Sequence, residues 1–359
     1  MANSEHLGGL VNMGNTCYAN SVLQAFRHCQ KIPWIFETGK FNTLFSKNPS
    51  ETRKKQQALA ITFADVVTLL EKCKRGQSVR PADFWTKLHA LINDTQFEQF
   101  IQKRPHDSHE MYLCLLDSLH ESVSQAVNMK ITRPPPETET DKHCIQALET
   151  WKREFEKTYS PLVDLFYGLT HIVVECQACK SKSHSWETFS ALKVTVPTNG
   201  TPTLDEMFKE EFKPEEIEGY ECTTCGPKRQ TARKTVSIWR LPYYLVIVLK
   251  RFTFDGRKIQ TPIAPLPMNG VQMSFQQFFS PESPEYKGDL TYSLHSIVDH
   301  HGHSGGGHYN AQCKSAGDMK WHVFDDDSVH PIPAPHFGNA SYMLWFERVP
   351  KATALAAEA

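Results

Sequence analysis

The chain has 359 residues, with 39 Lys and Arg against 40 Asp and Glu, and a formal net charge of −1. A protein that coats nucleic acid or an anionic membrane carries a basic excess, so this balance argues against both kinds of partner. With 40% hydrophobic and 22% charged residues, the composition is that of a folded domain and excludes global disorder.

Targeting and membrane signals are weak along the chain. The first 15 residues have no basic region followed by an apolar stretch. The longest apolar run, near 241–249, is less than half a bilayer span and contains Pro242. We therefore expect an intracellular protein, cytoplasmic or nuclear, without membrane contact, and we expect residues 349–359 to form a flexible tail.

The first 130 residues predict helices. Apolar residues recur at helical spacing in three segments, residues 15–29, 56–73 and 107–123. Asn15 or Thr16 can cap the first helix, and Asp107, with an acidic residue three positions later, fits a variant of the capping box for the third. The proline-rich, charged stretch 132–142 predicts an exposed loop.

From Leu165 onward the pattern changes to short β-branched or aromatic segments between turn signals, which predicts strands. These segments are 167–176, 190–196, 233–241, 244–252, 291–298, 307–314, 320–324 and 341–348. Only residues 203–212 predict a helix in this half. Helices followed by strands indicate an α+β protein with a groove between two lobes.

Four of the ten cysteines form two pairs, Cys176-x-x-Cys179 and Cys222-x-x-Cys225. A gap of two residues lets both thiolates of a pair reach one ion, and four thiolates satisfy tetrahedral zinc. We therefore predict one structural Zn²⁺ ion held by these four side chains. The alternative is four reduced thiols without a metal.

Cys17 stands at the first turn of the first predicted helix, after a tight turn. A helix N-terminus supplies partial positive charge and free backbone N–H groups, which stabilise a thiolate and an oxyanion facing it. This position makes Cys17 a candidate nucleophile. Taken alone, the position fits a core cysteine as well.

His308 follows three glycines, and an acidic run that starts at Asp325 comes seventeen residues later. A cysteine nucleophile needs a base, and the base needs a carboxylate or amide that fixes its tautomer. Two strands joined by a short turn would place Asp325 beside His308. The alternative is a solvated acidic turn and one of 17 histidines.

Several segments together resemble the ubiquitin-specific protease family, in that family's order, from about Leu7 to Arg348. "GLVNMGNTCYANSVLQ" is similar to its cysteine box and "HDSHEMYLCLLDSLH" to its second box. "LPYYLVIVLKRF" is similar to its palm strand, and "GGGHYNAQCK", "WHVFDDDSV" and "SYMLWFER" are similar to its histidine box and closing strands.

The resemblance implies a papain-like fold shaped like a hand, in a single catalytic domain over residues 7–348. The helical thumb would cover about 7–160 and the palm about 161–348. Zinc-bearing fingers of antiparallel strands around 170–240 would grip ubiquitin.

The same resemblance assigns roles to individual residues. Cys17 matches the family nucleophile and His308 its base. Asp325 matches the third catalytic position, and Asp326 matches the Asp that follows it. Asn12 matches the side chain that completes the oxyanion hole.

Asp107 matches the family's acidic residue that meets the basic tail of ubiquitin. The chain departs from the family pattern here, because Pro105 and His106 replace the usual pair of Gln and Met111 replaces the usual Phe. A helix cap without a substrate contact is therefore the alternative for Asp107.

The activity that the resemblance implies is a thiol-dependent deubiquitinase that hydrolyses the (iso)peptide bond after the C-terminal glycine of ubiquitin, through a Cys-His-Asp triad and a thioester. Ubiquitin and its conjugates would be the partners of a monomeric enzyme. Three alternatives stay open: a protease for another ubiquitin-like modifier, a catalytically weak ubiquitin-binding module, and a zinc ribbon for nucleic acid, which the neutral charge opposes.

Overall fold

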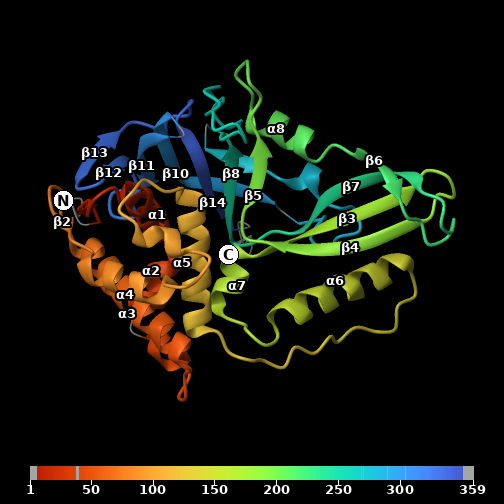
Figure 1. The fold of residues 1–359 in the computed structure, drawn as a ribbon, viewed down its shortest axis with the longest axis horizontal. Coiled ribbons are helices and arrows are strands. Elements are labelled where there is room, and N and C mark those ends of the chain that lie inside the picture. The colour runs from red at the N-terminus through yellow and green to blue at the C-terminus, as the bar shows by residue number, and fades with distance from the viewer. Residues whose placement is uncertain are drawn as a thin grey trace, which may run out of the picture.

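The structure, a computed structural model, describes residues 6–37, 40–267, 269, 271–288, 290–303 and 305–350. From residue 351 on, the tail expected at the C-terminus lies outside the described residues. A helical lobe stands on one side of the molecule, a large sheet crosses its middle, and a smaller sheet projects from the other side (Figure 1). Among the described residues, none of the helices combines the length and the apolar content needed to cross a membrane.

The helical lobe is built from the first part of the chain. Its helices are α1 (Cys17–Arg27), α2 (Lys31–Glu37), α3 (Glu51–Lys72), α4 (Ala82–Ile92) and α5 (Ser108–Val123), with a short parallel ladder of β1 (Gly9–Leu10) and β2 (Ser78–Val79) beside them. All residues of α1 are buried, so its polar side chains need internal partners. Gln24 Nε2 donates to the Gly8 carbonyl at 2.9 Å, and Arg27 pairs with Glu71 at 3.1 Å.

The central sheet has eight strands in the order β13-β12-β11-β10-β14-β8-β5, with β9 also paired to β10. The strands are β5 (Leu192–Thr195), β8 (Tyr244–Lys250), β9 (Gln272–Ser274), β10 (Thr291–His303), β11 (Gly306–Lys314), β12 (Trp321–Asp325), β13 (Ser328–Ile332) and β14 (Ser341–Arg348). The pairs are antiparallel except β5 with β8.

Both faces of the central sheet are covered, which explains the continuous apolar run of β8. Val246 and Val248 pack into the core shared with the helical lobe, whereas Leu245 and Ile247 pack into a second core with α8 (Leu204–Glu211). Because α1 contacts β10, β11 and β12, the first core joins the helical lobe directly to the sheet.

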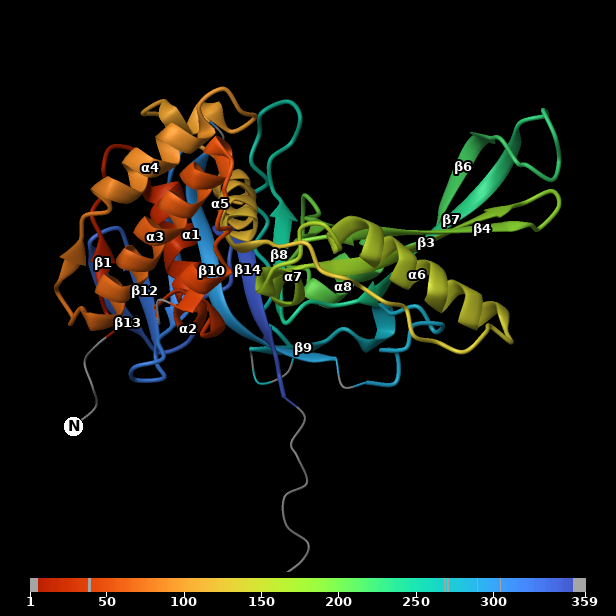
Figure 2. The same ribbon diagram turned by 90° about the horizontal axis from the view of Figure 1, so that it is seen from below.

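The smaller sheet has four strands in the order β4-β3-β7-β6. They are β3 (Gly168–Cys176), β4 (Lys182–Phe189), β6 (Glu215–Tyr220) and β7 (Gln230–Arg240). The sheet is long and narrow, and the end that carries β6 projects away from the rest of the molecule (Figure 2).

Two helices that the periodicity does not predict follow the helical lobe. α6 (Glu139–Phe155) contacts β4, and its Trp151 shares a small core with Trp186 and Trp239 of the four-stranded sheet. α7 (Pro161–Phe166) leads into β3. The loop predicted over 132–142 is wrong at its end: Thr138 and Asp141 form a capping box, so the helix starts at residue 139.

Candidate active site and cysteine cluster

The N-terminus of α1 places Cys17 between the helical lobe and the central sheet. Thr16 occupies the N-cap position, but its hydroxyl accepts from the Met13 N–H at 2.9 Å and does not cap the helix. The backbone N–H groups of Cys17 and Tyr18 are therefore available to the Cys17 sulfur, which they reach as hydrogen-bond donors. A third donor comes from the sheet, the backbone N–H of Tyr309 in β11.

Burial dominates the acidity of the Cys17 thiol. The side chain is buried, which raises its pKa, and the negative charge of Asp326 raises the pKa further. The backbone N–H groups oppose both effects without cancelling them. The structure thus departs from the sequence argument that a helix start lowers this pKa, because burial and a nearby carboxylate outweigh the helix terminus. The raised pKa favours the neutral thiol of Cys17, so a nucleophilic role would require a base.

His308 is the candidate base and lies on β11, one residue before the Tyr309 N–H. Its Nε2 forms a hydrogen bond with Asp325 Oδ1, at the end of the neighbouring strand β12. His308 and Asp325 are 43% and 41% exposed at their side chains, so the pair opens to solvent on one side. Because the carboxylate holds Nε2, Nδ1 is the ring nitrogen left to exchange a proton with a reacting group.

Asp326 anchors the tight turn between β12 and β13 to the helical lobe. Its carboxylate accepts from Asn12 Nδ2 and from Asn20 Nδ2, each at 2.8 Å, and its backbone carbonyl accepts from Leu10 N at 2.7 Å. The residue has a positive φ of 50°, which a short polar side chain tolerates. Asp326 is therefore a structural link between the lobes as well as a charged neighbour of Cys17.

Two residues of this link were missed by the sequence argument. Asn20 lies on α1, where a buried amide three residues past the nucleophile carries no recognisable spacing. Gly9 passes so close to the same turn that a Cβ atom would lie 2.5 Å from the Asp327 backbone. The need for an amide at residue 20 and for a glycine at residue 9 becomes apparent only when the turn is placed against the helical lobe.

Both the oxygen and the nitrogen of the Asn12 side-chain amide form hydrogen bonds. Its Oδ1 accepts from Gly14 N at 2.9 Å and from Thr16 N at 3.1 Å, and its Nδ2 donates to Asp326. This leaves one proton of the amide nitrogen for a further acceptor. The side chain is thus held in one orientation at the loop that precedes Cys17.

Asp107 caps α5, as its position in the sequence predicts, and also contacts the sheet. Its Oδ1 accepts from the His109 and Glu110 N–H groups at 2.6 and 3.3 Å, and Tyr342 donates its hydroxyl to Oδ2 at 2.7 Å. The carboxylate lines a cavity of about 240 Å³ that Tyr309 and the glycines before His308 also line. Asp107 therefore lies beside the candidate active site, and both of its carboxylate oxygens accept hydrogen bonds from other residues of the chain.

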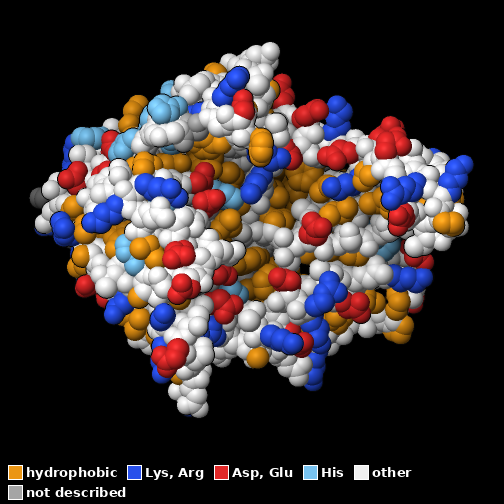
Figure 3. All heavy atoms as spheres, viewed as in Figure 1, with side chains coloured by type: hydrophobic (Ala, Val, Ile, Leu, Met, Phe, Trp, Pro, Cys, Tyr) orange, Lys and Arg blue, Asp and Glu red, His pale blue; other side chains and the backbone are white. Residues whose placement is uncertain are grey.

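One of the two glycines that line this cavity, Gly307, is required by close packing. A Cβ atom on Gly307 would lie 2.3 Å from the His301 carbonyl and 2.4 Å from His300 Nε2. The strand β11 can therefore carry no side chain at residue 307. Figure 3 shows that this face of the molecule is hollowed at its centre, with hydrophobic side chains on the floor and charged ones around the rim.

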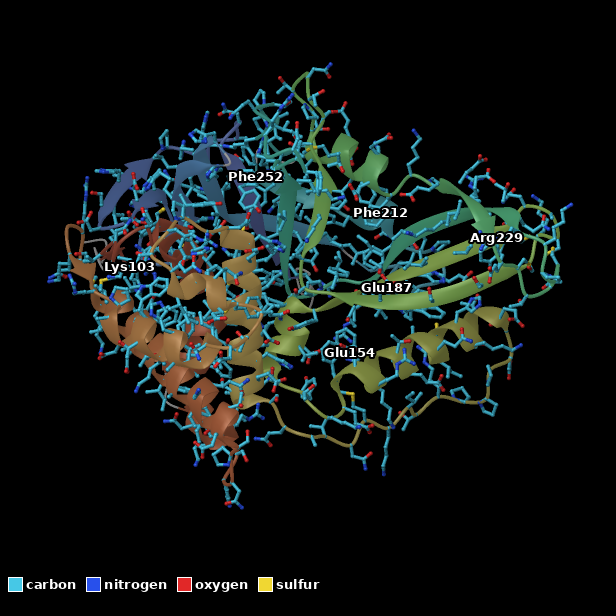
Figure 4. The ribbon with its side chains drawn as sticks, in the orientation of Figure 1. Lys103, Glu154, Glu187, Phe212, Arg229 and Phe252 are labelled. Atoms are coloured by element: carbon cyan, nitrogen blue, oxygen red, sulfur yellow. The ribbon has the colours of Figure 1, made fainter. Side chains whose placement is uncertain are left out.

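The four paired cysteines converge at the far end of the four-stranded sheet, near Arg229 in Figure 4. Their Sγ atoms all lie within 4.8 Å of one another, with separations of 3.8 Å for Cys176 to Cys225 and 3.5 Å for Cys179 to Cys222. A tetrahedron of Zn–S bonds of ~2.3 Å has sulfur separations of ~3.8 Å. The donor set and its spacing therefore suit a zinc ion.

Comparison with known proteins identifies the family. The family model described as ubiquitin carboxyl-terminal hydrolase matches residues 8–346. The chain therefore belongs to the ubiquitin carboxyl-terminal hydrolase family, and the resemblance drawn from its motifs is confirmed.

Individual relatives agree with this. The chain is 28% identical to bovine ubiquitin carboxyl-terminal hydrolase 2, over 96% of its own length and 55% of that protein. It is 27% identical to human ubiquitin carboxyl-terminal hydrolase 21, over 94% of its own length and 61% of that protein. The chain thus spans little more than half of these relatives.

The fold has a counterpart among solved structures. The structure of the SAGA Ubp8/Sgf11/Sus1/Sgf73 DUB module bound to ubiquitin aldehyde matches with a TM-score of 0.71 and 21% identity, covering 98% of this chain and 71% of the other. The predicted α+β, papain-like class is confirmed: the helical lobe is the thumb, the central sheet the palm, and the four-stranded sheet the fingers.

The charge of Asp326 gives a first testable prediction. Asp326→Asn removes one negative charge near the Cys17 sulfur, so we expect the pKa of this thiol to fall. The pH dependence of iodoacetamide alkylation of the Cys17 peptide, followed by mass spectrometry, measures that pKa. Asp327→Asn, one residue farther along the turn, is the matched control. An unchanged or higher midpoint in Asp326→Asn would contradict the assignment of this charge.

Proposed function

We propose that this chain is a thiol-dependent deubiquitinase, which hydrolyses the (iso)peptide bond after the C-terminal glycine of ubiquitin. The observation that carries the proposal is the meeting of Cys17, at an uncapped helix start, with the Tyr309 N–H next to the hydrogen-bonded pair of His308 and Asp325. Family membership and the ubiquitin aldehyde bound in the Ubp8 module support ubiquitin as the substrate.

In the acylation step, His308 Nδ1 takes the thiol proton as the Cys17 sulfur bonds to the carbonyl carbon of the terminal glycine. The resulting oxyanion is stabilised by backbone N–H groups at the start of α1 and by the free amide proton of Asn12. The C–N bond then breaks, His308 returns the proton to the leaving lysine amine, and a thioester remains.

Hydrolysis reverses the roles. His308 removes a proton from water, the hydroxide oxygen attacks the thioester carbon, and the C–S bond breaks. The proton returns to the Cys17 sulfur, and ubiquitin leaves with a free carboxylate. Asp325 keeps Nε2 protonated throughout and stabilises the imidazolium.

The cavity beside His308 is proposed to hold the end of the substrate. Gly306 and Gly307 line it with backbone atoms only, which suits a segment that is slender at its end. A C-terminal Gly-Gly pair meets this requirement. Asp107 lies at the same cavity and is proposed to meet the basic tail of ubiquitin while it caps α5.

The fingers complete the proposal. Cys176, Cys179, Cys222 and Cys225 would hold one structural Zn²⁺, and Ser181 Oγ lies 3.1 Å from Cys179 Sγ, where its hydrogen bond lowers the pKa of that thiol. When bound, the ion would tie two hairpins together.

We further propose a single catalytic domain over 7–348 that acts as a monomer, since nucleophile, base and carboxylate all come from one chain.

The modifier itself is decided by a labelling experiment. We expect a ubiquitin that carries a C-terminal thiol-reactive group to label the full chain at Cys17, and related modifiers with the same group to leave it unlabelled. Labelling by another modifier in place of ubiquitin would establish the alternative substrate. Absence of any labelling would favour a catalytically inactive binding module.

The nucleophile is tested by Cys17→Ser. The change removes one reactive atom with almost no change in volume, so we expect turnover of a ubiquitin C-terminal amide to fall to background while ubiquitin binding is kept. Cys73→Ser, at a partly buried cysteine that ends α3, is the control and should keep full activity. More than trace hydrolysis by Cys17→Ser would mean that another thiol does the chemistry.

The orienting carboxylate is tested by Asp325→Ala against Asp327→Ala. Loss of the carboxylate on Nε2 leaves the tautomer of His308 unspecified, so we expect kcat/KM to fall by roughly 10²-fold or more. Asp327→Ala, in the same turn, should change it less than about twofold, a difference at the limit of ordinary assays. Equal losses in both variants would show that the turn acts only as structure.

The metal of the fingers is tested by Cys222→Ser. Loss of the ion should unfold the tips of the hairpins and leave the groove at Cys17 intact. We therefore expect lower kcat/KM on full ubiquitin substrates, mainly through KM, and a much smaller effect on a Leu-Arg-Gly-Gly peptide substrate. Zinc content per chain is measured alongside. Normal cleavage of ubiquitin by a variant without zinc would show that the ion is dispensable for the grip.

A further inference from the structure

A second group of metal-ligating side chains lies away from both the active site and the cysteine cluster. It lines a cavity of about 990 Å³ between α6, one face of the four-stranded sheet and the segment after η3 (Gln276–Phe278). Phe212, at the end of α8, marks one side of this region, and α6, which carries Glu154, runs beside the edge strand β4 (Figure 4).

Three elements that are distant in sequence each contribute one ligand-type side chain. His143 comes from α6, His184 from β4, and Glu282 from the segment after η3. One ligand atom from each lies within 4.8 Å of the others. His143 Nδ1 is 2.5 Å from Glu282 Oε2, and the rings of His143 and His184 stack with their centroids 3.8 Å apart.

A third histidine fixes the orientation of His184. His171 Nε2 lies 3.0 Å from His184 Nδ1, and His171 Nδ1 lies 3.1 Å from Ser280 Oγ. In the tautomer where His171 donates to Ser280, its Nε2 accepts from the Nδ1–H of His184. This leaves the lone pair of His184 Nε2 for a ligand, the arrangement in which metal-bound histidines are usually held.

The charges around the cluster suit a bound cation. Glu282 supplies a negative charge at the cluster. The nearby cation Lys182 is paired with Glu175 at 3.5 Å, which reduces its opposition to a bound cation.

We propose that His143, His184 and Glu282 bind one divalent transition-metal ion of the zinc class, with His171 as the hydrogen-bonded support of His184. Two imidazoles and a carboxylate are a donor set that such ions accept, with water at the remaining position. Stacked rings direct their lone pairs in parallel, so the rings turn when they coordinate. The ion fastens α6 and the segment at Glu282 to β4. The inference is independent of the proposed function, since none of its ligands belongs to the catalytic group.

Cobalt titration of the full, zinc-loaded chain tests this site. Cobalt bound by nitrogen and oxygen gives weak visible bands, whereas cobalt that replaces zinc at the cysteines gives an intense thiolate charge-transfer band. We expect a single equivalent of the first kind in the wild type, and none in His143→Gln or Glu282→Gln, both of which keep the size and a polar end of the side chain. His171→Phe should weaken binding by about 10–100-fold.

Two control variants exclude other histidines. His330→Gln, at an exposed position of β13, should bind cobalt as the wild type does. His303→Gln tests the histidines that precede the glycine run near the active site. Loss of the ion in His303→Gln but not in His143→Gln would overturn the proposal, as would absence of binding in the wild type.

A thermal measurement guards against variants that merely fail to fold. Added cobalt should raise the Tm of the zinc-loaded wild type, because the ion binds the folded state only. The Tm of His143→Gln should start near the wild-type value and not respond to cobalt. An equal rise of Tm in both proteins would place the ion elsewhere and overturn the assignment.

Discussion

The candidate active site depends on how the tight turn between β12 and β13 packs against the N-terminal loop that precedes α1. Cys17 belongs to the thumb, whereas His308 and Asp325 belong to the palm, so their distance depends on how the lobes meet. At that junction Asp326 accepts hydrogen bonds from Asn12 and Asn20. Such charge-assisted bonds are stronger than neutral ones and are directional, so they fix the orientation that apolar contact alone would leave loose.

The Asp326 carboxylate also disfavours ionisation of the Cys17 thiol. Placing Asp326 near the Cys17 sulfur raises the pKa of the thiol, which burial already raises. In the proposed mechanism, Asp326 therefore serves positioning, and the backbone N–H groups and His308 make the thiolate when it is needed. A protonated resting thiol is also less nucleophilic toward oxidants than a thiolate.

The fingers show how a long sheet with a small core is stabilised. Its apolar cluster is confined to the end near α6, where Trp151, Trp186 and Trp239 meet. Beyond that point, side chains with polar ligand atoms take the place of apolar packing. Four cysteines lie together at the far end. His143, His184 and Glu282 lie together where α6 and the segment after η3 meet the sheet. Cross-links by metal ions suit such a region because each ion ties several elements at a single point.

Local chemistry along the sequence determined much of this protein. Apolar periodicity predicted α1, α3 and α5, and β-branched or aromatic segments between turn signals predicted most of the strands from β3 to β14. Both patterns depend only on residues that are close in sequence. The two-residue spacing of the cysteine pairs and the motifs around Cys17 and His308 are equally local. They were sufficient for the fold class and the family. The start of α6 at residue 139 was missed because its capping box lies inside a proline-rich stretch that predicts a loop.

Only the tertiary structure decided which distant residues meet. Asn20 and Asp326 are 306 positions apart, and no spacing rule connects them. Gly9 is required only because the backbone of Asp327 passes beside it. The pKa of Cys17 depends on burial and on a carboxylate from the other lobe, so the helix start alone gave the wrong direction. His143, His184 and Glu282 become neighbours only when α6 lies on β4, since packing, unlike periodicity, brings together side chains from anywhere in the chain.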